Sequence, residues 1–351
     1  MPQPVLGVVV VSFNSSDVLF DCLESVMAAR DITLHVVVVD NASTDGTPRL
    51  LRDWAAGHTP YIPPNDIPFD LTACEKPLAL AMGQAAQGAA PGLTLIEAPT
   101  NLGFAGGVNL GLACLAANPT IERFWILNPD GIAAPGTPEA FVRAVVPAKG
   151  FSLMGGRVTY LNPPDQVQID GGTLNARTGV TGNLNLGRDI RDTPPPSISD
   201  ITFITGASMV ASRTFYDTVG PMREDYFLYY EEVDWAMRRG NLPLALCPEA
   251  RVYHRAGTAI GSPTLGRIAS PFSLYFKHRG RMRFMRRFYP RALPIAWAYS
   301  VAKAGQMMLK GNYTEAMALI AGSRDAAPPQ VVRDQIGPNA AQLAFAPAPD
   351  K

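Results

Sequence analysis

The sequence lacks features that would assign it to several special classes of protein. It has no continuously apolar window of 18 or more residues and no basic segment before its first apolar run, so we expect a cytoplasmic protein. Its 30 basic and 30 acidic residues cancel, which argues against a general nucleic-acid binder. The cysteines show no paired spacing, so neither a disulfide framework nor a zinc site is predicted. They are Cys22, Cys74, Cys114 and Cys247.

The sequence does contain an alternation of short apolar runs and helical patterns over its first 150 residues. Apolar runs at 5–13, 34–40, 93–98 and 123–128 predict strands, and the patterns at 16–29, 47–56 and 106–118 predict helices. Continuously apolar strands separated by helices predict a mostly parallel α/β sheet with helices on both faces. An insert at about 55–92 is rich in Pro, Gly and Ala, and we interpret it as a lid, a small helical excursion or a mobile loop.

Polar residues follow three of the predicted strands. The first strand ends in Ser12-Phe13-Asn14-Ser15-Ser16, the second in Asp40-Asn41, and the fourth in Asn128-Pro129-Asp130. Each group alone fits a turn or a helix cap, but the carboxyl ends of parallel strands converge on one ligand-binding edge. There Asp40 can accept a hydrogen bond from N3–H of uracil or thymine. Asp130 can bind Mg²⁺ or Mn²⁺ that bridges a diphosphate, with Asn128 facing the ribose.

The segment "NLGFAGGVN" opens the third predicted helix with small residues. Asn101 and Gly103 stand where backbone can approach a ligand closely, and free N–H groups at a helix start favour an anion. Tight packing of helix on sheet explains the glycines equally well. A Rossmann dehydrogenase is disfavoured, because "VSFNSS" replaces the glycine-rich turn expected after the first strand.

The segment "YFLYYEEVDWAMRRG" concentrates carboxylates. In a helix over 231–240, Glu231, Asp234 and Arg238 share one side, and Glu232 points about a hundred degrees away. One acid can thus turn inward while the others brace it. Alternatively, these carboxylates only face the positive end of the helix dipole. We expect Asp234 to brace the helix from a buried position or to contact the acceptor substrate. For Trp235 we expect a place in the core, with stacking on a sugar as the second choice.

Seven blocks in order resemble the family-2 inverting glycosyltransferases over about residues 5–260. The blocks are "VVVVSFNSSDVLFDCLESV", "VVVVDNASTDGT", "NLGFAGGVNLGL", "WILNPDG", "FITGASMVASRTFYDTVG", "EDYFLYYEEVDWAMR" and "CPEARVYHRAG". The resemblance implies a GT-A nucleotide-sugar-binding fold in a domain spanning residues 1–265. It is greatest to the rhamnosyltransferase branch, whose members often carry Asn-Pro-Asp where the family has Asp-x-Asp.

The resemblance implies roles for individual residues. Asp130 and His254 would bind Mg²⁺ or Mn²⁺ with two phosphate oxygens, although an isolated His after a strand is more often structural. Because the first acid of the motif is missing, we expect modest metal affinity. Glu232 is the implied catalytic base, with Glu231 as the alternative. The expected nucleotide-sugar-binding residues are Ser12, Asn14, Asp40, Asn41, Asn101, Gly103, Asn128, Asp130 and Gly206, the last as floor beneath the sugar or as a packing contact.

The implied function is inverting transfer of a sugar to a glycan or a polyprenyl-diphosphate-linked acceptor in cell-surface polysaccharide synthesis. We expect L-rhamnose from dTDP-rhamnose as the donor, with UDP-hexose or UDP-galactofuranose as alternatives. A hypothesis of another class is a catalytically weak nucleotide-sugar-binding or regulatory protein, since fold alone does not determine activity.

The C-terminal part has a different character. Residues 266–325 form a basic amphipathic helical region, in which 275–291 predict contact with the inner membrane surface through anionic lipid. The alternative is a helix whose arginines are solvated or clamp a diphosphate. Its basic residues are Lys277, Arg279, Arg281, Arg283, Arg286, Arg287 and Arg291. Residues 326–351, rich in Ala and Pro, predict a disordered tail.

Overall fold

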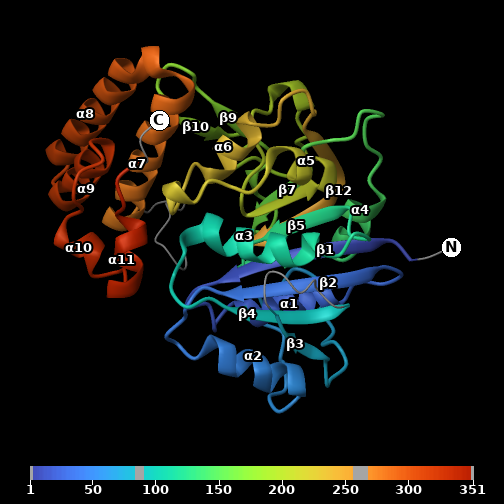
Figure 1. Ribbon diagram of the computed structural model, residues 1–351. Helices are drawn as coiled ribbons and strands as arrows, with labels where there is room; N and C mark the ends of the chain where they lie inside the picture. Colours follow the sequence, from blue (N-terminus) through green and yellow to red (C-terminus); the bar gives the residue numbers. More distant parts are fainter. Residues whose placement is uncertain (1–2, 84–90, 256–267, 349–351) are drawn as a thin grey trace.

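The computed structural model describes residues 3–83, 91–255 and 268–348 and confirms an α/β architecture around a large, mostly parallel sheet (Figure 1). The main sheet has the order β3-β4-β2-β1-β5-β11-β7-β12-β6, with β8 paired to β7, and β9 and β10 form a separate pair. The strands are β1 Val5–Ser12, β2 Thr33–Asp40, β3 Leu80–Met82, β4 Gly92–Glu97, β5 Arg123–Leu127, β6 Gly131–Ala133, β7 Leu153–Tyr160, β8 Val167–Ile169, β9 Gly172–Leu174, β10 Thr181–Asn183, β11 Ser208–Ser212 and β12 Ala245–His254. The α-helices are α1 Leu19–Met27, α2 Thr47–Ala56, α3 Gly103–Ala116, α4 Thr137–Arg143, α5 Arg213–Val219, α6 Glu231–Met237, α7 Pro271–Phe288, α8 Leu293–Leu309, α9 Tyr313–Ser323, α10 Gln330–Arg333 and α11 Pro338–Ala344.

The middle parts of β1 and β2 are continuously apolar, at 8–11 and 36–39, because both faces of the sheet are covered. In β1, Val9 faces the core beneath α3, whereas Val8 and Val10 face a second core that includes residues of α1, α2 and α4. All three are fully buried. Period-two alternation thus places successive valines in opposite cores, which explains why no polar residue interrupts the run.

The pairing register brings the polar strand ends together. Strands β3, β4, β2, β1 and β5 are parallel neighbours, and Ser12 pairs with Asp40. Strand β6 continues directly from the Asn-Pro-Asp turn and runs antiparallel to β12, so that Gly131 pairs with His254. Two segments more than a hundred residues apart in sequence therefore meet at Asp130.

The insert is anchored to α1 over its described part. Glu24 is fully buried and accepts hydrogen bonds from Trp54 Nε1 at 2.8 Å, the Cys74 amide at 2.7 Å and Lys76 Nζ at 2.8 Å. Further along, β3 adds an edge strand parallel to β4. Residues 57–83 are thus a loop ending in an edge strand, and no helical excursion occurs in them; residues 84–90 lie outside the described part.

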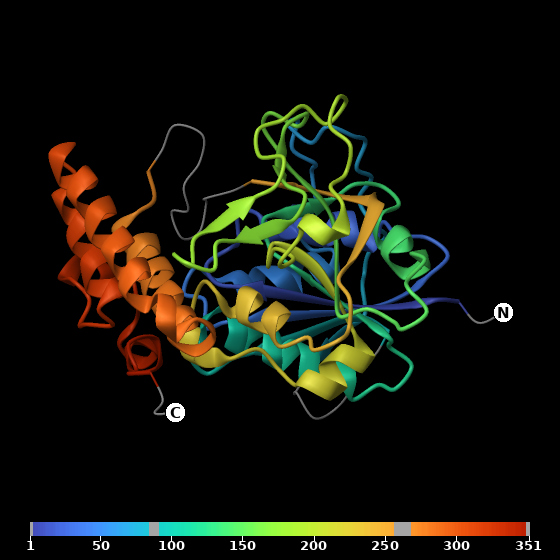
Figure 2. The same ribbon diagram turned by 90° about the horizontal axis from the view of Figure 1, so that it is seen from above.

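The C-terminal helices stand together at one end of the molecule, far from the N-terminus (Figures 1 and 2). The expected disordered tail is wrong for residues 326–348, which include α10 and α11. Val332, Ile336, Ala340 and Ala344 are buried in one cluster with aromatic residues of α7. They come from α10, from the turn after it and from α11, so two short helices and their connection together bury one apolar side, which the Ala- and Pro-rich composition concealed. Among the described residues, no helix is both long and apolar enough to cross a membrane.

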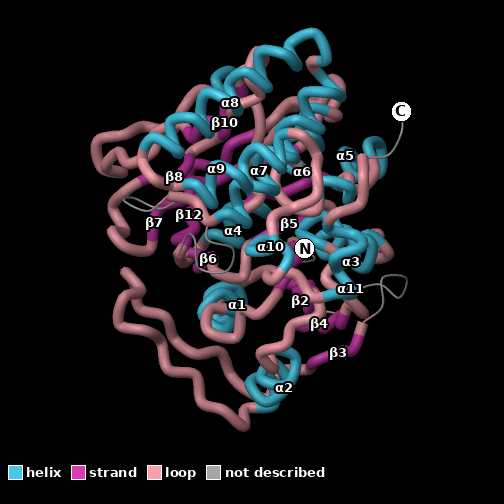
Figure 3. Tube along the Cα trace, turned by 90° about the vertical axis from the view of Figure 1, so that its left-hand side faces the viewer, coloured by secondary structure: helices cyan, strands magenta, loops and turns pink. Residues whose placement is uncertain are grey.

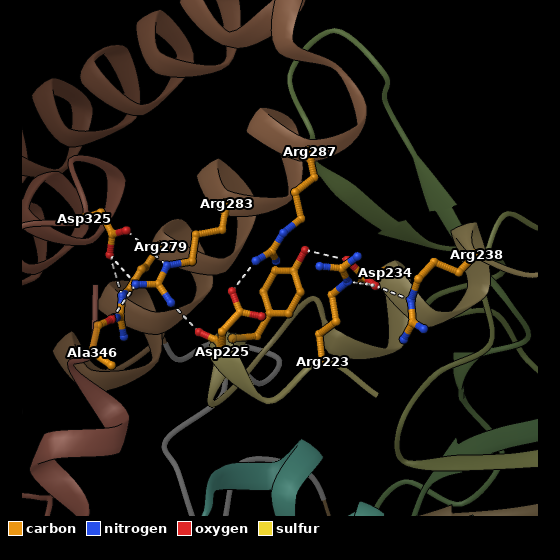
Figure 4. A network of polar contacts seen from close by, with 10 residues as sticks. Arg223, Asp225, Asp234, Arg238, Arg279, Arg283, Arg287, Asp325 and Ala346 are labelled. Atoms are coloured by element: carbon orange, nitrogen blue, oxygen red, sulfur yellow. Dashed lines mark hydrogen bonds and ion pairs between the residues drawn. The ribbon is translucent and has the colours of Figure 1, made fainter. Parts of the chain in front are cut away.

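Of the arginines of α7, Arg279, Arg281 and Arg283 are buried, Arg287 is partly covered and Arg286 is exposed. The ion pairs of Arg279, Arg283 and Arg287 contradict their expected role as a lipid-facing surface (Figure 4). Arg279 and Arg283 are each 2% exposed and both pair with Asp325, at 2.7 Å and 2.8 Å. Both also donate to the carbonyl of Ala346. Arg287 pairs with Asp225. These charges hold the C-terminal chain against α7, because a buried guanidinium needs a carboxylate and several acceptors.

Candidate active site

The Asn-Pro-Asp turn and the end of β12 form a compact polar cluster. Asp130 Oδ1 lies 3.0 Å from His254 Nε2, and Asn128 Nδ2 lies 3.3 Å from the same nitrogen. The turn is fixed by its backbone, since the Gly131 amide donates to the Asn128 carbonyl at 3.0 Å and the Asn128 amide donates to Ala207 at 3.0 Å. The structure thus brings together the residues for which the sequence implied a metal site.

Gln168, in β8, orients the imidazole of His254. His254 Nδ1 lies 2.9 Å from Gln168 Oε1, so Nδ1–H donates to the amide oxygen and Nε2 is left to face Asp130. Burial would lower the pKa of His254, but the Asp130 carboxylate more than offsets burial and raises it above the ordinary value. His254 Nε2 can therefore either carry a proton that it donates to Asp130 or bind a cation together with Asp130.

The geometry of this pair fits a hard divalent cation. Adjacent ligands of an octahedral ion with bonds of about 2.1 Å lie about 3.0 Å apart, the separation found between Asp130 and His254. In the described residues no three His, Cys, Asp or Glu side chains converge as a metal site. Asp130 and His254 would thus hold the ion from one side and leave its other positions to donor oxygens, and a mixed oxygen and imidazole set suits Mn²⁺ or Mg²⁺.

The ends of β1 and β2 leave unsatisfied acceptors. Asp40 Oδ2 accepts from the Ser43 amide at 3.0 Å, but Asp40 Oδ1 and Ser12 Oγ are buried without a hydrogen-bond partner among the described residues. Burial raises the pKa of Asp40 despite the contacts with Ser43. Buried acceptors are costly unless a ligand pairs with them. A ring N–H supplies that partner, which fits the pyrimidine expected there.

Three other residues that were expected to contact the nucleotide sugar, Asn14, Asn41 and Asn101, hold loops together instead. Asn41 Nδ2 donates to Asn101 Oδ1 at 3.0 Å and to the Gly103 carbonyl at 2.9 Å, and Asn41 Oδ1 accepts from the Leu102 amide at 2.9 Å. Asn14 Oδ1 accepts from the Thr44 amide at 2.7 Å, which joins the β1–α1 loop to the loop after β2. The side-chain amides of Asn14 and Asn41 therefore fix the backbone of the loops that surround the site.

The expected anion site at the start of α3 is contradicted for its first two amides. The Gly103 amide donates to Asn101 Oδ1 at 2.9 Å, and the Phe104 amide donates to the Phe227 carbonyl at 2.9 Å. Gly103 has φ of +74°, and a Cβ there would lie 2.3 Å from that carbonyl oxygen. The glycine is therefore required by close packing of two backbones.

Gly206 lies in the turn that precedes β11. A Cβ at Gly206 would lie 3.3 Å from the ring of Phe104, and the glycine itself is only partly covered. The next residue, Ala207, accepts the hydrogen bond from Asn128. The turn thus lies beside the Asn-Pro-Asp segment, and its tight contact is with α3.

A strained turn presents the two glutamates at the start of α6. Phe227, Tyr229 and Tyr230 have φ of 64°, 68° and 76°, values that non-glycine residues seldom adopt. Glu231 is 3% exposed and Glu232 is half-buried. Within the described part of the chain, Oε2 of each glutamate is buried without a hydrogen-bond partner.

The environments of the two glutamates differ. Burial, followed by the charge of Glu232, raises the pKa of Glu231 well above its ordinary value. Burial also raises the pKa of Glu232, but hydrogen bonds from the backbone at Glu232 and Val233 and, after them, the ammonium of Lys277 on α7 oppose this rise. The ionised form is thus better supported at Glu232 than at Glu231.

Asp234 and Trp235 are structural in their contacts. Asp234 is fully buried, pairs with Arg238 at 2.7 Å and with Arg223 at 3.5 Å, and accepts from Tyr226 Oη at 3.0 Å (Figure 4). Trp235 is packed on Phe215 with ring centroids 4.8 Å apart. The i,i+4 pair of Asp234 with Arg238 therefore braces α6 against its surroundings.

Sequence reasoning missed three contributors to the site. Gln168 lies in a strand too short to show a pattern, and the strained Phe227–Tyr230 turn carries bulky residues where glycine or asparagine is expected. Lys277 was grouped with the arginines of α7, although its charge faces Glu232. Only the long-range packing of α7 against the turn before α6 distinguishes it.

Comparison with known proteins finds similarity to glycosyltransferases. Residues 7–65 match the model of glycosyl transferase family 2. The chain is 24% identical over 286 residues, 76% of its length and 81% of the relative, to the N-acetylglucosaminyl-diphospho-decaprenol L-rhamnosyltransferase of Mycobacterium tuberculosis. It is 22% identical over 191 residues, 53% of its length and 58% of the relative, to the low-salt glycan biosynthesis hexosyltransferase Agl10 of Haloferax volcanii.

Two solved glycosyltransferase structures align with most of this chain at low similarity. The mannosyltransferase PcManGT from Pyrobaculum calidifontis, in complex with GDP-Man and Mn²⁺, is 18% identical with a TM-score of 0.49, covering 92% of this chain and 87% of its own. TarS 1-349 of S. aureus is 14% identical with a TM-score of 0.49, covering 94% and 83%. The match over residues 7–65 and the two curated relatives make this chain similar to glycosyltransferases of family 2.

Proposed function

We propose that the protein transfers L-rhamnose from dTDP-rhamnose, with inversion, to a polyprenyl-diphosphate-linked sugar. The single observation that carries the sugar and the acceptor is the similarity to the mycobacterial L-rhamnosyltransferase, which extends over 76% of the chain and 81% of that relative. The pyrimidine base is supported by the unpaired acceptors Asp40 Oδ1 and Ser12 Oγ. UDP-hexose and UDP-galactofuranose present the same N3–H and are the alternative donors.

Binding of the donor places its diphosphate at Asp130 and His254. Asp40 accepts from the base, Asn128 faces the ribose, and Gly206 lies beneath the sugar. When bound, a divalent cation supplies positive charge to the departing diphosphate. Gln168 keeps Nε2 of His254 directed at Asp130, so that the pair is ready for the cation.

The transfer is a single displacement. The acceptor hydroxyl oxygen attacks the anomeric carbon from the face opposite the diphosphate, and the bond from that carbon to the phosphate oxygen breaks. Glu232 takes the hydroxyl proton, and the nucleoside diphosphate leaves with the bonding electrons. Lys277 favours the ionised form of Glu232 that this step needs. One displacement without an enzyme nucleophile inverts the anomeric configuration.

The test combines transfer and binding measurements on Glu232→Gln. Gln keeps the size of Glu but cannot take a proton, so turnover should fall about a hundredfold or more while the thermal shift caused by the donor stays unchanged. Glu231→Gln should lose less activity, and Glu75→Gln, at an exposed glutamate, should retain it. Product NMR should show inversion.

Three outcomes would contradict the proposal. Full activity of Glu232→Gln would remove this residue from the mechanism, and a retained anomeric configuration would require an enzyme nucleophile. A parent protein that binds the donor but transfers sugar to no lipid-linked acceptor would favour the nucleotide-sugar-binding or regulatory function.

A further inference from the structure

Helix α8 presents its apolar side outward. Its buried residues are Ala296, Ser300, Ala304 and Met307, the first three at a spacing of four. Ala304 and Met307 pack in one cluster with Leu274 of α7 and Leu319 of α9. The outer side of an amphipathic helix is normally polar. Here it is formed by Ile295, Ala298, Val301, Ala302 and Leu309, all exposed.

This α8 face is larger than one row of residues. Trp297 and Met308 flank it and are 45% and 36% exposed, while Leu309 is 90% exposed. Beyond the turn at 310–312 the face continues onto α9 through Tyr313 and Met317, which are 65% and 57% exposed. Helix α8 lies on the outside of the C-terminal helices in two perpendicular views (Figures 1 and 3). Contiguous exposed apolar residues of this kind mark a surface of interaction.

The charges around the α8 face have one sign. Between residues 286 and 314 the chain contains no Asp or Glu. Arg286, Arg291, Lys303 and Lys310 are exposed and form no salt bridge with any residue in the described ranges. An isologous contact between two copies brings like residues face to face and would oppose positive charge with positive charge. The complementary partner is therefore apolar in its interior and anionic at its surface.

We propose that the α8 face, with the adjoining exposed residues of α9, docks this protein on an anionic lipid bilayer. Ile295, Val301 and Leu309 enter the acyl boundary, the indole of Trp297 lies at the level of the head groups, and Lys303 and Lys310 contact lipid phosphates. Helix α8 lies along the surface, because its inner row is packed on α7 and α9. Docking on a bilayer would bring the site close to a lipid-linked acceptor. Only this explanation of the docking rests on the proposed function.

Tryptophan fluorescence isolates the face in the whole protein. Of the four tryptophans, Trp54, Trp125 and Trp235 are at most 3% exposed, so Trp297 alone reports on solvent. Adding vesicles that contain phosphatidylglycerol should shift the emission to shorter wavelength. Trp297→Phe should remove the shift but keep sedimentation with the vesicles, because Phe retains most of the apolar area.

Matched variants separate this face from other exposed apolar residues. Ile295→Gln with Leu309→Gln, and separately Lys303→Glu with Lys310→Glu, should each weaken co-sedimentation with anionic vesicles about tenfold or more. Ile62→Gln and Val145→Gln change residues that are 82% and 96% exposed elsewhere, and should bind as the parent does. Vesicles of phosphatidylcholine alone should bind weakly, and the charge-reversed variant should lose its salt dependence.

Several results would overturn the proposal. The first is that the parent protein binds no vesicle. The second is that the α8 variants and the two controls bind equally. The third is that the parent is a dimer which Ile295→Gln with Leu309→Gln converts to a monomer, while no vesicle binding is seen. None of these measurements uses a sugar donor, so their failure is distinct from failure of the proposed transfer. Conversely, loss of transfer by Glu232→Gln leaves vesicle binding unchanged.

Discussion

At the scale of single residues, the acceptor at the end of β2 should select the base of the donor. Asp40 Oδ1 has no hydrogen-bond partner in the described ranges, and Asp40→Asn replaces one carboxylate oxygen by an amide that can also donate. We predict that dTDP and UDP raise the melting temperature of the parent well above the effect of ADP or GDP, and that Asp40→Asn removes most of this preference. Equal shifts with all four nucleotides would exclude Asp40 as the base contact.

His254 should make stability depend on pH. Its pKa is raised in the folded protein, so its contribution is fully present below the unfolded pKa of about 6.5 and is lost as pH rises through the higher folded pKa. Without divalent ions, the free energy of unfolding should fall above this pH in the parent. In His254→Asn that part of the fall should be absent. Urea titrations between pH 6 and pH 9 measure the difference, and parallel curves would show that Asp130 does not stabilise the imidazolium.

Metal binding at this pair has a control within the structure. Gln168→Leu keeps both proposed ligands, Asp130 and His254, but removes the hydrogen-bond acceptor at His254 Nδ1. We therefore expect weaker cation-dependent binding of the diphosphate, while binding without metal is retained. Calorimetry with dTDP, with and without Mn²⁺, separates the two. Cation-dependent binding as strong as in the parent would show that the imidazole needs no orienting partner.

At the scale of elements, the turn before α6 stores strain that substitutions can reveal. Tyr229 has φ of 68°, and its hydroxyl donates to Ser273 Oγ at 3.0 Å. Tyr229→Gly and Tyr229→Ala lose the same ring contacts, but only Ala retains the cost of the left-handed conformation. The Gly variant should therefore be the more stable by about 1 kcal/mol, the reverse of the usual order. Denaturant titration measures this, and a more stable Ala variant would mean that the turn relaxes in solution.

The C-terminal stripe offers a test with adjacent residues. Val332 is fully buried and Val331 is 39% exposed. Val332→Ala should cost about 2 kcal/mol, whereas Val331→Ala should cost less than about 0.5 kcal/mol. Hydrogen exchange of the amides in 330–344 should accordingly be up to about 30-fold faster in the first variant only. Equal exchange in both variants would favour a disordered tail.

At the scale of the whole molecule, the local sequence pattern predicted the features that depend on neighbouring residues, which are the buried strands and their polar ends. The valine runs of β1 and β2 allow no alternative to buried strands, and the polar strand ends follow from the parallel arrangement. The pairing of β6 with β12 could not be predicted, since it joins Gly131 to His254 across more than a hundred residues. The burial of Arg279 and Arg283 was missed because their partner, Asp325, lies in the turn after α9, more than 40 residues along the chain, and no helical period connects the two segments.

The contact between α7 and the turn before α6 sets a rule for building chimeras. A Cβ at Gly280 would lie 2.5 Å from the Tyr229 carbonyl oxygen, so any residue larger than glycine at 280 would push this turn and the glutamates that follow it. Grafting the C-terminal helices of a relative onto residues 1–255 should therefore succeed only when segment 226–230 is exchanged with them. Under the proposed lipid docking and the proposed lipid-linked acceptor, the C-terminal helices and the turn that presents the carboxylates form one transplantable unit, and a change of acceptor lipid in evolution would have to alter both together.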